Sequence, residues 1–128
     1  MKPLYGFLNT GLRKEYERNP HSLFIMRCGY ANGYVAVPPE HPAYGRNYED
    51  VEVDIHGGLT FGVKKSSIVN PEWWNDVEPL GFDAVSQIPD DYWIFGFDTF
   101  HYQDGPHLNR DWCVKEVGYL KEQLEMME

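Results

Sequence analysis

Residues 21–39 read HSLFIMRCGYANGYVAVPP, and this stretch predicts a β-hairpin. Two runs within it, 23–28 and 34–37, are rich in residues favoured in strands. The Asn32-Gly33 pair between them is preferred at tight hairpin turns, because both residues tolerate a positive φ. Pro38 and Pro39 end the second strand, since proline has no N–H to donate to a ladder. We therefore expect a sheet that begins with this hairpin.

Three further runs predict strands, and a long irregular segment separates two of them. Val51–Ile55 and Leu59–Val63 are β-prone, and residues 92–98, YWIFGFD, form a continuous aromatic run typical of a buried strand. Residues 66–92 are interrupted by three prolines, so we expect at most a short helix near Pro71–Asp76. A structureless connection of this length usually has a function.

The C-terminal segment predicts an amphipathic helix of about four turns, starting at Arg110 or Asp111. Apolar residues recur there at helical spacing: Trp112, Val114 or Val117, Leu120, Leu124 and Met127. Asp111 is the expected N-cap. Gly118 weakens the helix by roughly 1 kcal/mol relative to alanine and is a candidate point of close approach to a strand. The expected fold class is α+β: a small antiparallel or mixed sheet, this helix packed across it, and long irregular loops.

Size and charge restrict the classes of partner. A chain of 128 residues predicts a single domain over residues 1–128. Eleven Lys plus Arg against 20 Asp plus Glu give a net charge of -9, which argues against broad nucleic-acid binding. The same charge suits a protein that engages a basic surface. Neither a signal peptide nor an apolar run long enough for a membrane is evident, and Cys28 and Cys113 are expected as buried thiols, so we expect a cytoplasmic protein.

The stretch VEVDIHGGLTFG, residues 51–62, interrupts a strand-like run with a histidine and two glycines. Glycine pairs occur where the backbone turns or where a ligand approaches it closely. Histidine ligates metals and changes charge near neutral pH. His56, Gly57 and Gly58 therefore indicate a site.

A second polar group follows the aromatic strand. FGFDTFHYQDG places Asp98, His101 and Asp104 three residues apart, so a helical turn would bring them onto one face. With His56 from a neighbouring strand end, they would chelate a divalent metal or act as acid and base. The alternative is that Asp98 caps a turn and His101 forms hydrogen bonds in the core. HExxH, P-loop and GxSxG motifs are absent from the sequence, so no motif decides between these alternatives.

Aromatic residues make up 16% of the chain, so either some of them line a pocket or a partner interface, or the core itself is rich in aromatic rings. In a pocket they would stack on a base or sugar. The candidates are Tyr44, Tyr48, Trp73, Trp74, Trp93 and Tyr102. Arg46, or Lys64 and Lys65, would pair with phosphate.

Four segments together resemble a family of small accessory proteins of tailed bacteriophages: GYVAVPPEHPAYGRNY, VDIHGGLTFG, WIFGFDTFHYQDG and VKEVGYLKEQL. The family is marked by an HGGLT block followed by a W-x-x-GFD-x-x-H-x-x-D block, and the resemblance covers residues 33 to 125. It implies a phage or prophage product made in the bacterial cytoplasm, and it carries over no catalytic role. Thr99 stands where many relatives are expected to have a cysteine, which argues against an essential thiol there.

Three functions follow from these observations. The first is a phage counter-defence protein that sequesters a small nucleotide-type signal. Its ligand-binding residues would be Arg46, Tyr48, His56, Gly57, Gly58, Thr60, Trp74, Trp93, Asp98, His101 and Asp104. The second is a hydrolase of nucleotides or phosphodiesters that uses His56 and His101, with Asp98 or Asp104 orienting a ring or holding a divalent metal.

The third is an acidic inhibitor of a host protein. These residues of the C-terminal helix would also suit a homo-oligomer interface, although we expect them to pack in the core: Trp112, Leu120, Leu124, Met126 and Met127.

Overall fold

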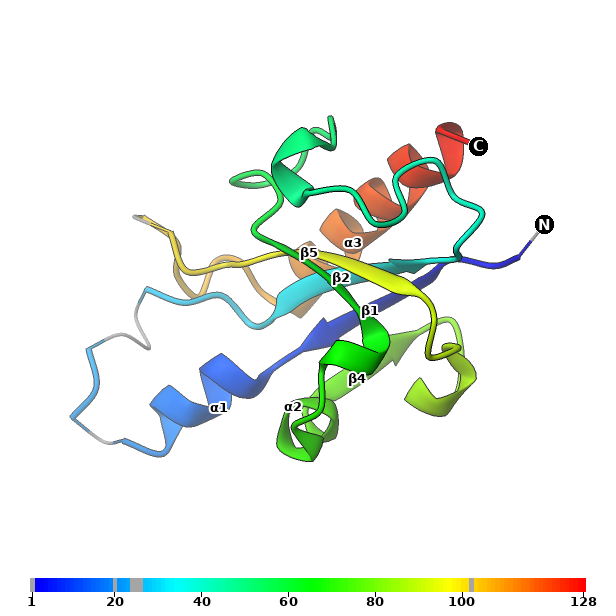
Figure 1. Ribbon diagram of the computed structural model, residues 1–128. Coiled ribbons are helices and arrows are strands. Elements are labelled where there is room, and N and C mark those ends of the chain that lie inside the picture. Colours follow the sequence, from blue (N-terminus) through cyan, green and yellow to red (C-terminus); the bar gives the residue numbers. More distant parts are fainter. Residues whose placement is uncertain (1, 20, 24–26, 102) are drawn as a thin grey trace.

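A five-stranded antiparallel sheet forms the centre of the computed structural model, which describes residues 2–19, 21–23, 27–101 and 103–128 (Figure 1). The strands are β1 (Tyr5–Asn9), β2 (Asn32–Val37), β3 (Phe61–Lys64), β4 (Val77–Leu80) and β5 (Trp93–Phe97). Their order across the sheet is β3-β5-β2-β1-β4, and every neighbouring pair is antiparallel. Among the described residues, the helices are α1 (Gly11–Glu17), α2 (Pro71–Asn75) and α3 (Arg110–Met126), and the 3-10 turns are η2 (Tyr48–Asp50), η3 (Lys65–Ser67) and η4 (Val85–Gln87). The expected α+β class is confirmed.

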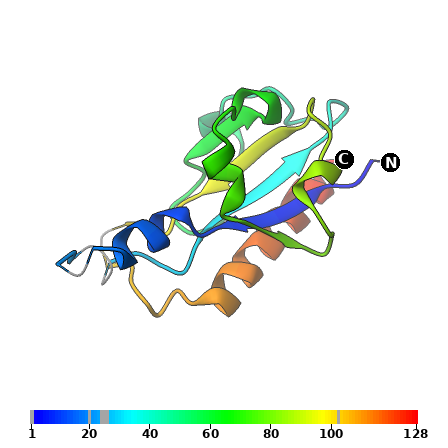
Figure 2. The same ribbon diagram turned by 90° about the horizontal axis from the view of Figure 1, so that it is seen from below.

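Both faces of the sheet are covered, and this explains why its central strands are apolar without interruption. Val35 and Phe95 point into the cluster beneath α3, whereas Tyr34 and Ile94 point into a second cluster on the other face. That second cluster includes the half-buried rings of Trp73 and Trp74. Figure 2 shows α3 along one side of the sheet and the segment containing α2 on the opposite side. Much of the aromatic surplus therefore serves as core.

Helix α3 confirms the strongest prediction from the sequence. Its buried residues are Cys113, Val117, Leu120 and Leu124, which recur every three or four positions and face β1 and β2. The helix lies close to the sheet because β1 and β2 carry glycines beneath it. A Cβ on Gly33 would lie 2.7 Å from Val117 Cγ2, and one on Gly6 would lie 2.9 Å from Val117 Cγ1.

Two details of the predicted helix are wrong. The N-cap is Asn109, whose side chain accepts a hydrogen bond from the Trp112 N–H, while Asp111 lies in the first turn. Asn109 precedes the first helical residue in extended backbone, which is where a capping side chain can reach back to the free N–H groups. Gly118 faces open space, so it marks no close approach to a strand.

The predicted hairpin is also wrong. Asn32 and Gly33 are the first residues of β2 and pair with Asn9 and Leu8 of β1. Gly33 also pairs with Phe97 of β5, so β2 obtains both neighbours from distant parts of the chain. Residues 24–26 lie outside the described residues, and Leu23, Arg27 and Cys28 are not in a strand.

The remaining strand predictions are met in part. β5 and β3 lie where strands are expected, but Val51–Ile55 has no ladder partner, although Val51 and Ile55 still point inward. Helix α2 confirms the short helix near Pro71, and Asn70 caps it. The supposedly irregular segment also contains β4, an edge strand in which Pro79 is tolerated because one side of the strand has no partner. β1 and α1 were not expected.

Both cysteines are buried thiols, as the sequence predicts. Burial raises the pKa of the Cys113 thiol. Within the described part of the chain, no helix has the length and apolar content that crossing a bilayer requires.

Candidate functional site

His56 is presented by a tight turn that the two glycines make. The Gly58 N–H donates to the Ile55 carbonyl at 3.0 Å, and Gly57 and Gly58 have φ values of +68° and +76°. Two consecutive positive φ values strongly favour glycine. The rings of His56 and of Trp112 on α3 pack in a T-shaped arrangement, with centroids 5.0 Å apart. The Gly-Gly pair therefore fixes the direction in which His56 points.

The loop after β5 brings the second group of polar residues to the same place. Thr99 anchors the start of the loop: its hydroxyl donates to the Ala31 carbonyl at 2.9 Å, and its N–H donates to Asn32 Oδ1. Asp98 Oδ1 accepts from the Phe100 N–H at 3.1 Å, so Asp98 does cap a turn. The expected helical turn is wrong, because Asp98, His101 and Asp104 are in no helix.

His56, His101 and Asp104 converge despite the absence of that helix. His56 Nε2 lies 2.9 Å from Asp104 Oδ1 and 3.0 Å from Oδ2. Asp104 is buried, and its Oδ2 also accepts from the His101 backbone N–H at 2.9 Å. The two imidazole centroids are 5.3 Å apart. We call these three residues the His-His-Asp cluster.

The His101 ring is held between Asp98 and Gly57. Its Nε2 lies 3.1 Å from Asp98 Oδ1 but, among the described residues, has no partner with hydrogen-bond geometry, and this atom is buried. A Cβ on Gly57 would lie only 2.3 Å from the same nitrogen. Glycine is therefore favoured at position 57 for two reasons: the positive φ, and the space beside it that the His101 ring occupies.

The cluster fits a divalent transition metal in donor type and in spacing. Each residue offers one ligand atom, and these atoms lie within 4.8 Å of one another. Zinc binds histidine nitrogen and carboxylate oxygen at about 2.0–2.2 Å, which puts tetrahedral ligands roughly 3.4 Å apart. To bind an ion, any two of these ligand atoms would therefore have to move closer together by about 1.4 Å at most. Two imidazoles and one carboxylate leave coordination positions open, as catalytic metal sites require. Asp98 beside His101 is a carboxylate of the kind that orients metal-bound imidazoles.

The surface beside His56 is hollowed into a depression of about 560 Å³ between residues 54–56 and the outer face of α3. Its lining comprises Asp54, Ile55, His56, Glu116, Tyr119, Glu122, Gln123 and Met126. Three carboxylates and no lysine or arginine are among these described residues, so the local field opposes phosphate groups. Gln123 ties the two sides together by bonding to both the N–H and the carbonyl of Asp54.

Of the other residues expected to hold a nucleotide, none that the structure describes belongs to the His-His-Asp cluster. Trp74 packs in the cluster on the opposite face of the sheet, and its Nε1 donates to the Ile68 carbonyl. Arg46 is exposed and donates to the Asp50 carbonyl. Tyr48 and Trp93 are half-buried against the core beneath α3.

Thr60 is exposed, with its N–H bonded to the Gly96 carbonyl. Lys65 also has internal partners, the Ile88 carbonyl and Asp90. The structure therefore brings together His56, Gly57, Asp98, His101 and Asp104, and it places Trp74 on the opposite face of the sheet. Tyr102, another of the expected base-stacking residues, lies outside the described residues.

Two features near the cluster were not expected from the sequence. Trp112 contacts His56, and Glu116 and Glu122 line the depression beside it. Helical periodicity places all three on α3, but nothing in the sequence indicates that the HGG turn packs beside this helix.

A separate cavity of about 450 Å³ lies among α1, β4 and the residues before α3, and no residue of the His-His-Asp cluster lines it. Among its charged groups, Lys14 pairs with Asp76 and Arg13 with Glu17, while Glu78 pairs with Arg110.

Three comparisons with known proteins give no relative: no family model, curated protein or solved structure matches this chain.

Proposed function

We propose that this protein binds one divalent transition-metal ion through His56, His101 and Asp104 and catalyses a hydrolytic reaction there. One observation carries the proposal: two imidazoles and a buried carboxylate, from segments more than 40 residues apart, place their ligand atoms within 4.8 Å. A bound ion of this kind lowers the pKa of its water ligand toward neutrality and so supplies a nucleophile. The chain's own contribution is to hold the imidazoles with the Gly57–Gly58 turn, Asp98 and Trp112.

A purely structural role for the same contacts is the principal competitor. Hydrogen bonds from His56 and the His101 N–H to Asp104 would fasten the loop after β5 to the HGG turn without any metal. Metal affinity separates the two roles, because a structural fastening needs no high-affinity ion.

Nucleotide sequestration has less support than a metal site. Arg46 and Trp74 do not accompany His56, and Asp54, Glu116 and Glu122 repel anions beside it. The proposal therefore concerns the class of reaction and leaves the substrate to the assay. The phage origin that the motif resemblance implies and the counter-defence role both stay predictions.

The test is a calorimetric zinc titration of the metal-free protein, followed by hydrolysis assays. We expect one zinc ion per chain with a dissociation constant below about 1 μM, and loss of at least ten-fold in affinity in His101→Ala and Asp104→Asn. His107→Ala is the matched control, because His107 is exposed and is not in the cluster. Near-ultraviolet circular dichroism in EDTA checks that each variant folds.

The hydrolysis assays compare bis(4-nitrophenyl) phosphate, an anionic phosphodiester, with 4-nitrophenyl acetate, a neutral ester. Turnover of either that requires zinc or manganese and disappears in His101→Ala supports the proposal. Millimolar zinc affinity, or equal affinity in His101→Ala and His107→Ala, would leave only the structural role.

A further inference from the structure

The depression on the outer face of α3 combines exposed apolar side chains with carboxylates. Only four large apolar side chains are strongly exposed among the described residues, and Tyr119 and Met126, 55% and 78% exposed, both line this depression. They lie seven residues apart on α3, two helical turns along one face. The buried Ile55 supplies apolar surface on the facing side.

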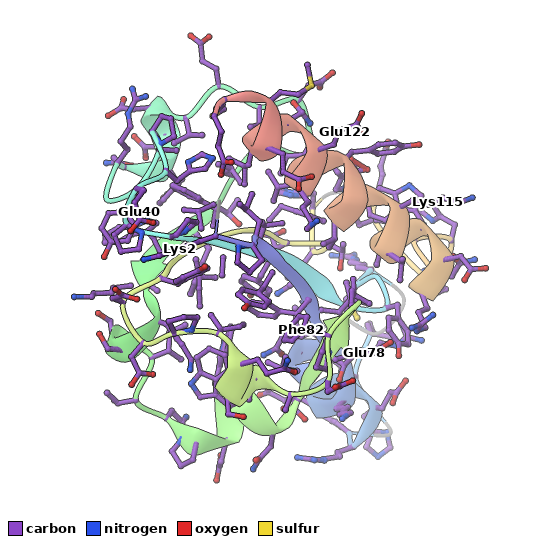
Figure 3. All side chains as sticks on the ribbon, turned by 90° about the vertical axis from the view of Figure 1, so that its right-hand side faces the viewer. Lys2, Glu40, Glu78, Phe82, Lys115 and Glu122 are labelled. Carbon is purple, nitrogen blue, oxygen red and sulfur yellow. The ribbon has the colours of Figure 1, made fainter. Side chains whose placement is uncertain are left out.

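Carboxylates surround these apolar groups. Asp54 lies on the facing segment, and Glu116 and Glu122 lie on α3. Figure 3 shows Glu122 and Lys115 projecting from the α3 ribbon. Within the part of the chain that the structure describes, none of the three carboxylates forms an ion pair, in contrast to Glu125, which pairs with Lys121 at 3.4 Å.

We propose that this depression docks a positively charged segment of another protein, in which lysine or arginine side chains alternate with apolar ones. Charge complementarity points to this occupant, because three unpaired carboxylates attract cations while Tyr119, Met126 and Ile55 offer apolar contact. Lysine and arginine side chains suit both, since their stems lie on apolar surface and their charged ends reach carboxylates or an aromatic face. A second copy of this chain fits poorly, because two surfaces with the same three carboxylates, on molecules of net charge -9, repel each other.

This surface does not depend on the metal site, although His56 borders both. The docking groups are Asp54, Ile55 and side chains of α3, whereas the proposed metal ligands are His56, His101 and Asp104. Measurements made in EDTA therefore test the docking surface whether or not zinc binds.

The probe is a fluorescein-labelled hexapeptide of alternating leucine and arginine, compared with a twin in which neutral citrulline replaces arginine. Fluorescence anisotropy is measured with the full chain in EDTA at 50 and 300 mM salt. We expect the arginine peptide to bind and the citrulline peptide to bind at least ten-fold more weakly, with affinity falling at high salt.

Two triple variants locate the binding. The first, Asp54→Asn with Glu116→Gln and Glu122→Gln, should weaken binding at least ten-fold. The second, Glu15→Gln with Glu49→Gln and Asp83→Asn, removes the same charge from exposed positions elsewhere and should change affinity less than two-fold. Met126→Gln, at an exposed position where folding is not at risk, should weaken binding at least three-fold.

Equal weakening in the two triple variants would show that only the overall charge attracts the peptide, and it would overturn the proposal. So would failure of the arginine peptide to bind the wild-type chain. A wild-type dimer in sedimentation that Met126→Gln dissociates would assign the surface to a second copy and overturn it as well.

Discussion

Replacing Gly57 with alanine perturbs the His-His-Asp cluster at a defined atom. The new Cβ would lie 2.3 Å from His101 Nε2 and 2.8 Å from both ring carbons beside it. Ordinary van der Waals contact begins at 3.4 Å, so the imidazole must recede by about 1.1 Å or the turn must open. Because His101 is one of the three proposed metal ligands, we expect zinc affinity to fall about 10- to 100-fold.

Gly58→Ala is the matched control for this change. Gly58 has almost the same backbone conformation, φ +76° against +68°, but a Cβ there would meet nothing within 4 Å. Both variants should lose roughly 1–2 kcal/mol of unfolding free energy from the left-handed backbone. Only Gly57→Ala should lose zinc affinity, with up to a further 1–3 kcal/mol of stability from the contact with His101.

The assay is urea denaturation in EDTA together with a zinc titration of each variant at 25 °C. Urea reports the backbone and packing costs without the metal, and the titration reports the displacement of His101. Equal zinc affinity in the two variants would refute the assignment of His101 as a ligand. Equal stability would show that the Gly57–His101 contact is absent.

Three further predictions concern the fold. Tyr34 is buried against Phe7 and Trp73, and burial raises its pKa from 10.0 to about 12. Because the unfolded chain forms the Tyr34 phenolate at a lower pH than the folded chain does, the wild type should lose unfolding free energy between pH 10 and 12. Between pH 9 and 12 the unfolding free energy of Tyr34→Phe should fall by about 2–3 kcal/mol less than that of the wild type, as measured by denaturation at the two pH values. An identical fall in the two proteins would contradict the burial of Tyr34. Gly118→Ala should raise the unfolding free energy by up to about 1 kcal/mol, since the new methyl group meets nothing, and any destabilisation in thermal melts would contradict this. Asn109→Ala should cost about 1 kcal/mol in the same melts and Asp111→Ala about half or less, whereas the reverse order would restore Asp111 as the cap.

The elements that could be predicted from the sequence are those whose signals are local and strong. Helix α3 repeats its apolar residues with helical period over 17 residues, and β5 is a continuous aromatic run. The Asn32-Gly33 signal failed because strand pairing is not local: β2 pairs with β1 and β5, and its first two residues complete those ladders. The short β1 and β4 contain glycine or proline and give no clear alternation, so their partners decide their structure.

The same distinction applies to the candidate site. The expected meeting of the HGG stretch with the segment that carries His101 and Asp104 is confirmed by the contact between His56 and Asp104, although the helical turn on which the expectation relied is absent. The grouping of Arg46 and Trp74 with His56 depends on which face of the sheet each segment covers. Trp74 lies on the face of the sheet opposite α3, where apolar burial against Phe7 stabilises its position. No pattern in the sequence indicates that choice of face.

The most direct measurement is an anomalous difference map, at the zinc absorption edge, from crystals of the protein grown with zinc. The account predicts a single strong peak within about 2.0–2.2 Å of one nitrogen of His56, one nitrogen of His101 and a carboxylate oxygen of Asp104. A strong peak at the carboxylates of α3 alone, with His56 still hydrogen-bonded directly to Asp104 at 2.9 Å, would contradict it.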